Sequence, residues 1–89
     1  MIKDIPTVIK FNTLGFDEKA WHVWHDATFL IVRQNKSYRV NLYFLNDYYI
    51  QLWYHVKNNR IEKIAATHSK KVIDPYLGLI EVSNLMKLN

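Results

Sequence analysis

The residues with the most obvious capacity for chemistry lie together in the run WHVWHD, at positions 21–26. His22 and His25 are three residues apart, a spacing that can place two imidazoles on one metal ion. Asp26 shares their side of a helix, but the sequence specifies no third ligand and no glutamate separates the histidines as in zinc proteases. We therefore predict that the run is a two-sided helix that binds no metal and no cofactor.

The other reactive side chains also lack the surroundings that catalysis requires. The serines have no nucleophile-elbow context, no glycine-rich loop exists to hold phosphate, and the acidic residues are too scattered to form a general acid/base pair. His55 and His68 have no carboxylate nearby in sequence, and the chain has no cysteine. We predict that the protein is not an enzyme and has no catalytic residues. The serines in question are Ser37, Ser69 and Ser83.

Two short helices are expected to precede the sheet. In the first, residues 4–15, Asp4 is the expected cap and Gly15 the stop. In the second, Asp17 is the expected N-cap, with Phe16 just outside it. A turn of about 100° per residue then divides that helix into two arcs. The arc expected to be buried is Ala20, Trp21, Val23, Trp24 and Ala27, and the arc expected to face solvent is Glu18, Lys19, His22, His25 and Asp26.

From Thr28 the hydrophobic period changes from helical to alternating. The segments TFLIVRQ, SYRVNLYF, YYIQLWYHV and RIEKIAATH are rich in aromatic and β-branched residues. The short clusters NK, LND and KNN between them are typical of turns. We therefore predict four antiparallel strands joined by tight hairpins.

The register of these strands follows if one face of the sheet carries all the buried apolar residues. A two-residue loop of Asn35 and Lys36 pairs Ile31 with Val40. A three-residue loop at 45–47 pairs Leu42 with Ile50, whereas a two-residue loop would oppose Leu42 with Gln51. We therefore predict the three-residue loop. The orientation of the fourth strand stays open, because Ile61 and Ile64 are three residues apart and would point to opposite faces of the sheet unless a β-bulge lies between them.

The expected fold is a single α+β domain over residues 1–89. Two N-terminal helices pack on one face of a four-stranded antiparallel β-meander, and Asp74 with Pro75 begins a short C-terminal helix or turn. Beyond it, Leu85, Met86 and Leu88 are expected to dock on the core. No segment approaches the ~20 apolar residues of a membrane span and the N-terminus lacks a signal-like run, so we expect a cytoplasmic protein that contacts no membrane.

The predicted register leaves an aromatic face opposite the helices, rich in residue types that are common at interfaces. We predict that this face contacts a protein partner, most simply a second copy of the chain in a homodimer. A structural reading stays open, in which the C-terminal tail covers part of the face and its aromatics form a second small core. The predicted partner-binding residues are Leu30, Val32, Arg39, Tyr43, Tyr49, Trp53 and His55.

Charge supports an alternative function for the same face. The net charge is +4, and between Arg33 and Lys71 eight basic residues stand against only Asp47 and Glu62. Tyr43, Tyr49 and Trp53 could stack the bases of single-stranded nucleic acid while the basic residues neutralise phosphates. The chain has no RNP-like motif, so this remains the alternative to protein contact.

Five short motifs together span most of the chain from Phe11 to Leu77: FDEKAWHVW, VNLYFL, YYIQLWYH, NRIEKI and PYL. In these motifs the chain resembles a family of short, uncharacterised bacterial proteins with no assigned activity. The resemblance implies a shared shape. It implies no chemistry, cofactor or partner.

Overall fold

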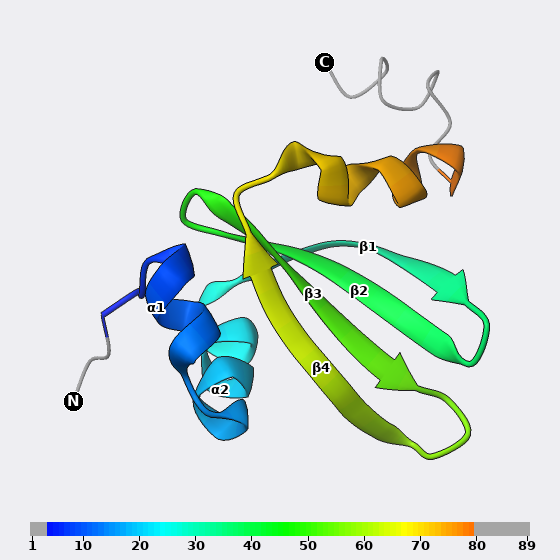
Figure 1. The fold of residues 1–89 in the computed structure, drawn as a ribbon, viewed down its shortest axis with the longest axis horizontal. Helices are drawn as coiled ribbons and strands as arrows, with labels where there is room; N and C mark the ends of the chain where they lie inside the picture. The colour runs from blue at the N-terminus through cyan, green and yellow to red at the C-terminus, as the bar shows by residue number, and fades with distance from the viewer. Residues whose placement is uncertain (1–3, 80–89) are drawn as a thin grey trace.

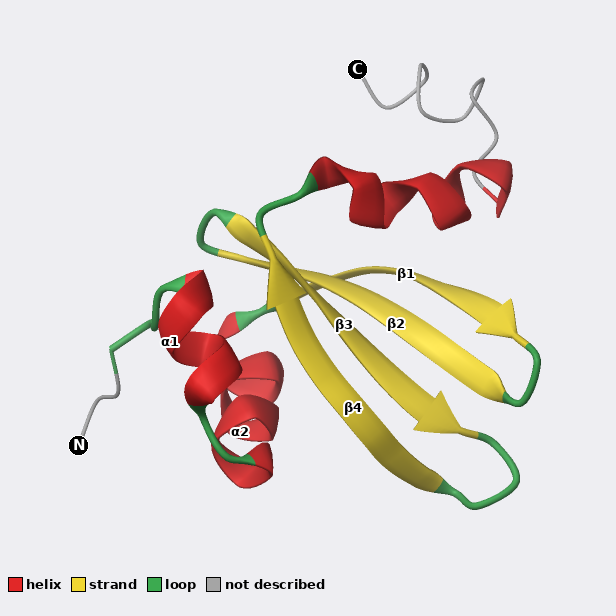
Figure 2. Cartoon of the chain, viewed as in Figure 1, coloured by secondary structure: helices red, strands yellow, loops and turns green. Residues whose placement is uncertain are grey.

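The computed structural model describes residues 4–79, and its elements follow the predicted order (Figures 1 and 2). The four strands form one antiparallel meander in the order β1-β2-β3-β4, so the predicted α+β fold is confirmed. Leu85, Met86 and Leu88, which were expected to dock on the core, lie outside the described residues. The elements are α1 (Val8–Thr13), α2 (Phe16–Asp26), β1 (Thr28–Asn35), β2 (Tyr38–Leu45), β3 (Tyr48–His55), β4 (Arg60–Thr67) and the 3-10 helix η1 (Lys70–Leu79).

The helix starts differ from the prediction by a few residues. Thr7, and not Asp4, caps α1, and its side-chain oxygen accepts a hydrogen bond from the Lys10 amide at 3.2 Å. Gly15 occupies the N-cap position of α2, with no side-chain cap, so Asp17 lies inside the first turn. A carboxylate there still interacts favourably with the positive end of the helix dipole.

The main core lies between the two helices and one face of the sheet, toward one end of the strands (Figure 1). Phe11 of α1 and Val23 of α2 pack there against alternate residues of β2, β3 and β4. The Tyr48 ring is fully buried beside Phe11, with centroids 6.1 Å apart, and its hydroxyl donates to the Pro6 carbonyl at 2.9 Å. This contact ties the segment before α1 to the sheet.

Side chains from both helices form hydrogen bonds with backbone groups on the free edge of β4. The Asn12 amide nitrogen donates to the Ala66 carbonyl at 2.8 Å, and the Ala66 amide donates to the Asn12 side-chain oxygen at 2.9 Å. Two residues away on the same edge, the Lys19 ammonium donates to the Ile64 carbonyl at 3.0 Å. An uncovered edge strand invites pairing with other chains, so these contacts protect β4 from such association.

The opposite face of the sheet has its own small core beneath η1. Tyr76 of η1 is fully buried, as is Val40, and Leu42 is almost fully buried. The Gln51 amide donates to the Tyr76 hydroxyl at 3.0 Å. Since Gln51 alternates along β3 with the residues that face the helices, η1 covers the other side. The structural reading of this face, a tail lying over a second core, is therefore correct for the part beneath η1.

The predicted register of β2 is wrong. The β2–β3 loop has two residues, Asn46 and Asp47, so Leu42 pairs with Gln51 and not with Ile50. Asn46 has φ of 56°, which suits the first position of a tight hairpin turn. The first hairpin loop is also shifted, to residues 36–37, which pairs Ile31 with Leu42.

The β2 register was mispredicted because both faces of this strand are buried. Val40 and Leu42 pack beneath η1, while Tyr43 and Leu45 belong to the helix-side core. A strand that is covered on both sides carries apolar residues on both faces, so its sequence does not show which face points toward the helices. The face of β3 that points toward the helices was predicted correctly, since Ile50, Leu52 and Tyr54 pack on the helix side.

A β-bulge resolves the orientation of β4. Trp53 pairs with Lys63, whereas Tyr54 pairs with Ile61, which leaves Glu62 as the extra residue. The bulge allows Ile61 and Ile64 to pack on the same core despite their opposite parity. It also turns Glu62 toward the η1 side, where its carboxylate meets Tyr38.

The buried side of α2 is rotated from the predicted arc. His22 is only 3% exposed, whereas Trp24 is 57% exposed. Helix α2 packs against β2 and β4 on one side, and His22 also lines a hollow between α2 and the segment that contains α1. Contact with two neighbours widens the buried side toward His22 and leaves Trp24 at the margin of the sheet.

Candidate functional site

The predicted partner-binding residues do not form one surface. Tyr49, Trp53 and His55 lie on the η1 side, as predicted for β3. Arg39 and Tyr43 lie on the helix side because the β2 register differs, and Tyr43 is buried in the core. The two apolar residues of β1 are also separated from the others: Val32, paired with Asn41, lies on the helix side, and Leu30 stands at the bulge of the exposed strand.

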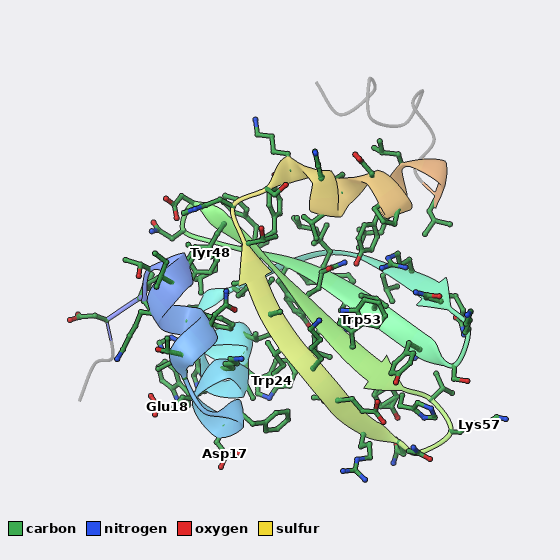
Figure 3. The ribbon with its side chains drawn as sticks, in the orientation of Figure 1. Asp17, Glu18, Trp24, Tyr48, Trp53 and Lys57 are labelled. Atoms are coloured by element: carbon green, nitrogen blue, oxygen red, sulfur yellow. The ribbon has the colours of Figure 1, made fainter. Side chains whose placement is uncertain are left out.

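The helix side contains an uncovered area that we call the open platform. It is the part of the sheet that α1 and α2 do not reach, and Trp24 stands at its border beside a hollow of about 330 Å³. Figure 3 shows Trp24 between α2 and the sheet. The platform has Trp24 as its wall and the buried Leu52 as its floor; its other residues are the exposed Phe29, Val32 and Arg39 and the half-buried Asn41, Tyr54 and Ile61.

Large apolar side chains of the platform are unusually exposed. Trp24 is 57% exposed, Phe29 53% and Val32 38%. Phe29 packs edge-on against Tyr43, with ring centroids 5.6 Å apart, so it is positioned by the core beneath it. A contiguous apolar area of this kind on a small domain is typical of a contact surface.

A second candidate site, which we call the Trp53 pocket, lies on the η1 side. Its volume is about 340 Å³ and it is lined by Tyr38, Trp53, Glu62 and Lys63. The Tyr38 hydroxyl donates to a Glu62 carboxylate oxygen at 2.6 Å. This hydrogen bond is the main reason that the pKa of Glu62 is lowered and that the pKa of Tyr38 is raised. Glu62 is therefore an anion at neutral pH.

Aromatic contacts hold the walls of the Trp53 pocket in place. The Tyr38 ring packs edge-on against Trp53 at 5.5 Å and against His55 at 5.0 Å. The Arg33 guanidinium lies 5.3 Å from the centroid of the Trp53 ring and 5.2 Å from that of Tyr76. Such contacts between cations and rings stabilise both partners. Within residues 4–79, the Arg33 Nε atom is buried without a hydrogen-bond partner.

The histidines of α2 have separate structural partners. His22 Nδ1 lies 2.9 Å from a carboxylate oxygen of Asp26, and His25 Nδ1 lies 2.8 Å from the Trp21 carbonyl. His25 also stacks on the Trp21 ring with centroids 4.1 Å apart. Residues 4–79 contain no group of three potential metal ligands.

The other described histidines and serines lie at strand ends, in turns or just before η1. His55 Nδ1 accepts a hydrogen bond from the Asn58 amide at 3.1 Å, and His68 lies 3.4 Å from Asp47 where both are exposed. The Ser69 hydroxyl oxygen accepts from the amide of Lys71 in the first turn of η1. Ser83 lies outside the described residues.

Most residues of the candidate sites were absent from the predicted partner-binding set, and Glu62 and Trp24 show why. Glu62 points into the pocket because of the β4 bulge. The sequence indicated such a bulge only through the spacing of Ile61 and Ile64, which would point to opposite faces of a regular strand. Trp24 looked like a core residue because its neighbours at helical spacing are apolar. The sequence offered no comparable signal for its exposure, because that depends on where α2 ends relative to the sheet.

Comparison with protein-family models, with curated proteins and with solved structures gave no match to this chain. Helices within residues 4–79 are all too short or too polar to cross a lipid bilayer. Any function assigned to the protein therefore depends on the geometry of the open platform and the Trp53 pocket.

Proposed function

We propose that the protein is a small interaction module without enzymatic activity that forms a homodimer through the open platform. The observation that carries the proposal is the exposure of Trp24, Phe29 and Val32 on the helix side of the sheet, with Trp24 lining a hollow that also contains the apolar Leu52 and Ile61. Full burial of an exposed apolar side chain contributes about 1.5–3 kcal/mol, and since these three are already about half-buried, each would add roughly half of that on association. Two members of the predicted partner-binding set, Val32 and Arg39, belong to this surface.

Charge complementarity favours a second copy as the occupant. Asp17 and Glu18 lie in the first turn of α2, whereas Arg39 lies on the platform and Lys57 at the tip of the β3–β4 hairpin. Figure 3 shows the acidic residues and Lys57 at opposite ends of the molecule. In a two-fold dimer each contact occurs twice, so the acidic end of each copy would meet the basic end of the other.

The apolar contribution is tested by substituting Trp24. Trp24→Glu places a charge at the border of the platform and should convert the dimer to a monomer in sedimentation velocity over a range of concentrations. Leu77→Glu is the matched control, because Leu77 is similarly exposed but lies on η1, on the other face. A wild-type protein that stays monomeric at high concentration would refute self-association.

The arrangement of the two copies is tested by charge reversal. One variant carries Asp17→Lys and Glu18→Lys, and the other carries Arg39→Glu and Lys57→Glu. Each variant alone brings like charges together and should dissociate, whereas an equimolar mixture should form a heterodimer. A mixture that remains monomeric while the wild type is a dimer would exclude this two-fold arrangement.

A further inference from the structure

The Trp53 pocket combines features that the homodimer does not use. It lies on the face of the sheet opposite the platform, at the hairpin end, beyond the part that η1 covers through Tyr76. It is lined by the Trp53 ring, the Glu62 carboxylate and the Lys63 ammonium group, and the Arg33 guanidinium lies over the Trp53 ring, so a ligand would use the ring face that Arg33 does not cover. A volume of about 340 Å³ is at the lower end for ligand pockets, so it suits one small planar group.

The carboxylate is built into the pocket by the fold. The β4 bulge turns Glu62 toward the pocket, and bulges commonly re-aim a side chain at a functional position. The Tyr38 hydroxyl donates to one of its oxygens and the Asn58 side chain also contributes a hydrogen bond, but a carboxylate has about four lone-pair sites, so Glu62 retains acceptor capacity for a ligand. A group that fits here should therefore be flat and should carry hydrogen-bond donors on its edge.

The surrounding charge is positive. From β1 to β4 the carboxylates are Asp47 and Glu62, and Asp47 lies in the β2–β3 turn at the other end of the strands. Within residues 4–79, neither Arg33 nor Lys63 forms an ion pair. A positive field disfavours a cationic peptide and attracts a polyanion. The basic residues of this region are Arg33, Lys36, Arg39, Lys57, Arg60 and Lys63.

We propose that the Trp53 pocket binds one unpaired base of single-stranded nucleic acid. The base stacks on the Trp53 ring, its exocyclic amino group donates to Glu62, and Lys63 neutralises an adjacent phosphate. Cytosine and adenine carry such an amino group, whereas thymine and uracil place a carbonyl oxygen at the same position. That oxygen would face the Glu62 carboxylate and repel it, so the pocket prefers amino-bearing bases.

The preference is measured with fluorescein-labelled oligonucleotides of roughly eight nucleotides, a length typical of such sites. Oligo-dC should bind the wild-type protein more tightly than oligo-dT in fluorescence anisotropy at low salt. Glu62→Gln should bring the dC/dT affinity ratio close to one, because an amide can donate to the thymine carbonyl as well as accept. The ratio is the readout, since loss of a negative charge strengthens the binding of both.

Two further variants test the stacking and the phosphate contact. Trp53→Leu should weaken oligo-dC binding by roughly 5- to 150-fold through loss of one stacked base. Lys63→Ala should reduce the slope of log affinity against log salt by about 0.7, the value for one phosphate contact on a single strand. Lys10→Ala is the matched control, because it removes the same charge from the exposed side of α1.

Three outcomes would overturn base binding at this pocket. Absence of oligonucleotide binding at low salt refutes the proposal. Oligo-dC binding that Trp53→Leu leaves unchanged, together with a dC/dT affinity ratio that Glu62→Gln leaves unchanged, identifies a non-specific electrostatic contact and refutes the pocket as its site. An arginine-containing peptide that binds the pocket more tightly than oligo-dC would replace the nucleic acid with a protein segment. None of these results bears on the homodimer, because the platform lies on the other face.

Discussion

We predict that the protein loses stability at alkaline pH because the Tyr48 hydroxyl is buried, and that Tyr48→Phe abolishes this loss. The Tyr48 ring is inaccessible to solvent, and its hydroxyl donates to the Pro6 carbonyl. Burial, and to a smaller extent the charges of Asp47 and Asp26, raise the pKa of Tyr48 to about 12. In the unfolded chain the pKa of a tyrosine is about 10.

The direction of the effect follows from the number of protons that each state binds. Below pH 10 both states keep the Tyr48 proton, so its contribution does not vary with pH. Above about pH 10 the unfolded chain releases the proton and the folded chain retains it until about pH 12, so the free energy of unfolding falls in this window. A shift of two units corresponds to at most about 2.7 kcal/mol. Since the hydroxyl lies at the margin of the core beside exposed Asp47, solvent screening reduces this to roughly 1–2 kcal/mol.

The assay is urea unfolding of the wild type and Tyr48→Phe, near pH 7 and at about pH 11.5. Near neutral pH the variant should be less stable by about 1 kcal/mol, because it loses the hydrogen bond to Pro6. At the higher pH the difference should shrink by roughly 1–2 kcal/mol or change sign, because phenylalanine does not ionise. Tyr49→Phe is the control for loss of a hydroxyl, since Tyr49 lies on the other face of β3. A difference that is equal at both pH values would refute the reasoning.

Two further predictions concern single contacts. Asn12→Ala should lower the free energy of unfolding by about 1–3 kcal/mol, because the Ala66 amide and carbonyl both lose their partner. Asn12→Asp keeps the acceptor for the Ala66 amide but turns a carboxylate oxygen toward the Ala66 carbonyl, so it should also destabilise in the same denaturation experiment, and an Asp variant as stable as the wild type would contradict the two-bond arrangement. Tyr38→Phe should raise the pKa of Glu62 toward the ordinary carboxyl value, since the hydrogen bond that favours the anion is lost. An NMR titration of the Glu62 carboxyl measures this, and Tyr54→Phe, on the other face, should leave it unchanged.

Most of the fold could be predicted because its signals are local. The change from helical spacing to alternation at Thr28 marked the boundary between helices and sheet, and short polar clusters marked the three hairpins. The sequence also predicted which residues of β3 face the helices, since Ile50, Leu52 and Tyr54 alternate with more polar or aromatic residues. The predicted C-terminal element around Pro75 proved to be η1.

The candidate sites were less predictable, because they depend on contacts between distant segments. The predicted partner-binding residues included Arg39 and Tyr43 together with Trp53, which lie on opposite faces once the β2–β3 loop has two residues. Trp53 lies on the face of β3 that the alternation predicted, and there it lines a pocket that the sequence did not predict. Its neighbour Glu62 depends on a bulge, whose presence the sequence allowed but did not require.

The sequence by itself determined the order of the elements, the meander and the excess of basic charge in its middle, since these depend on residues near one another in the chain. Only the tertiary structure decided which side of β2 faces the helices. Both sides of that strand are apolar because η1 covers one and α1 with α2 the other, so hydrophobic burial favours either register equally until the covering segments are in place. That choice separates the open platform from the Trp53 pocket and gives each its own face.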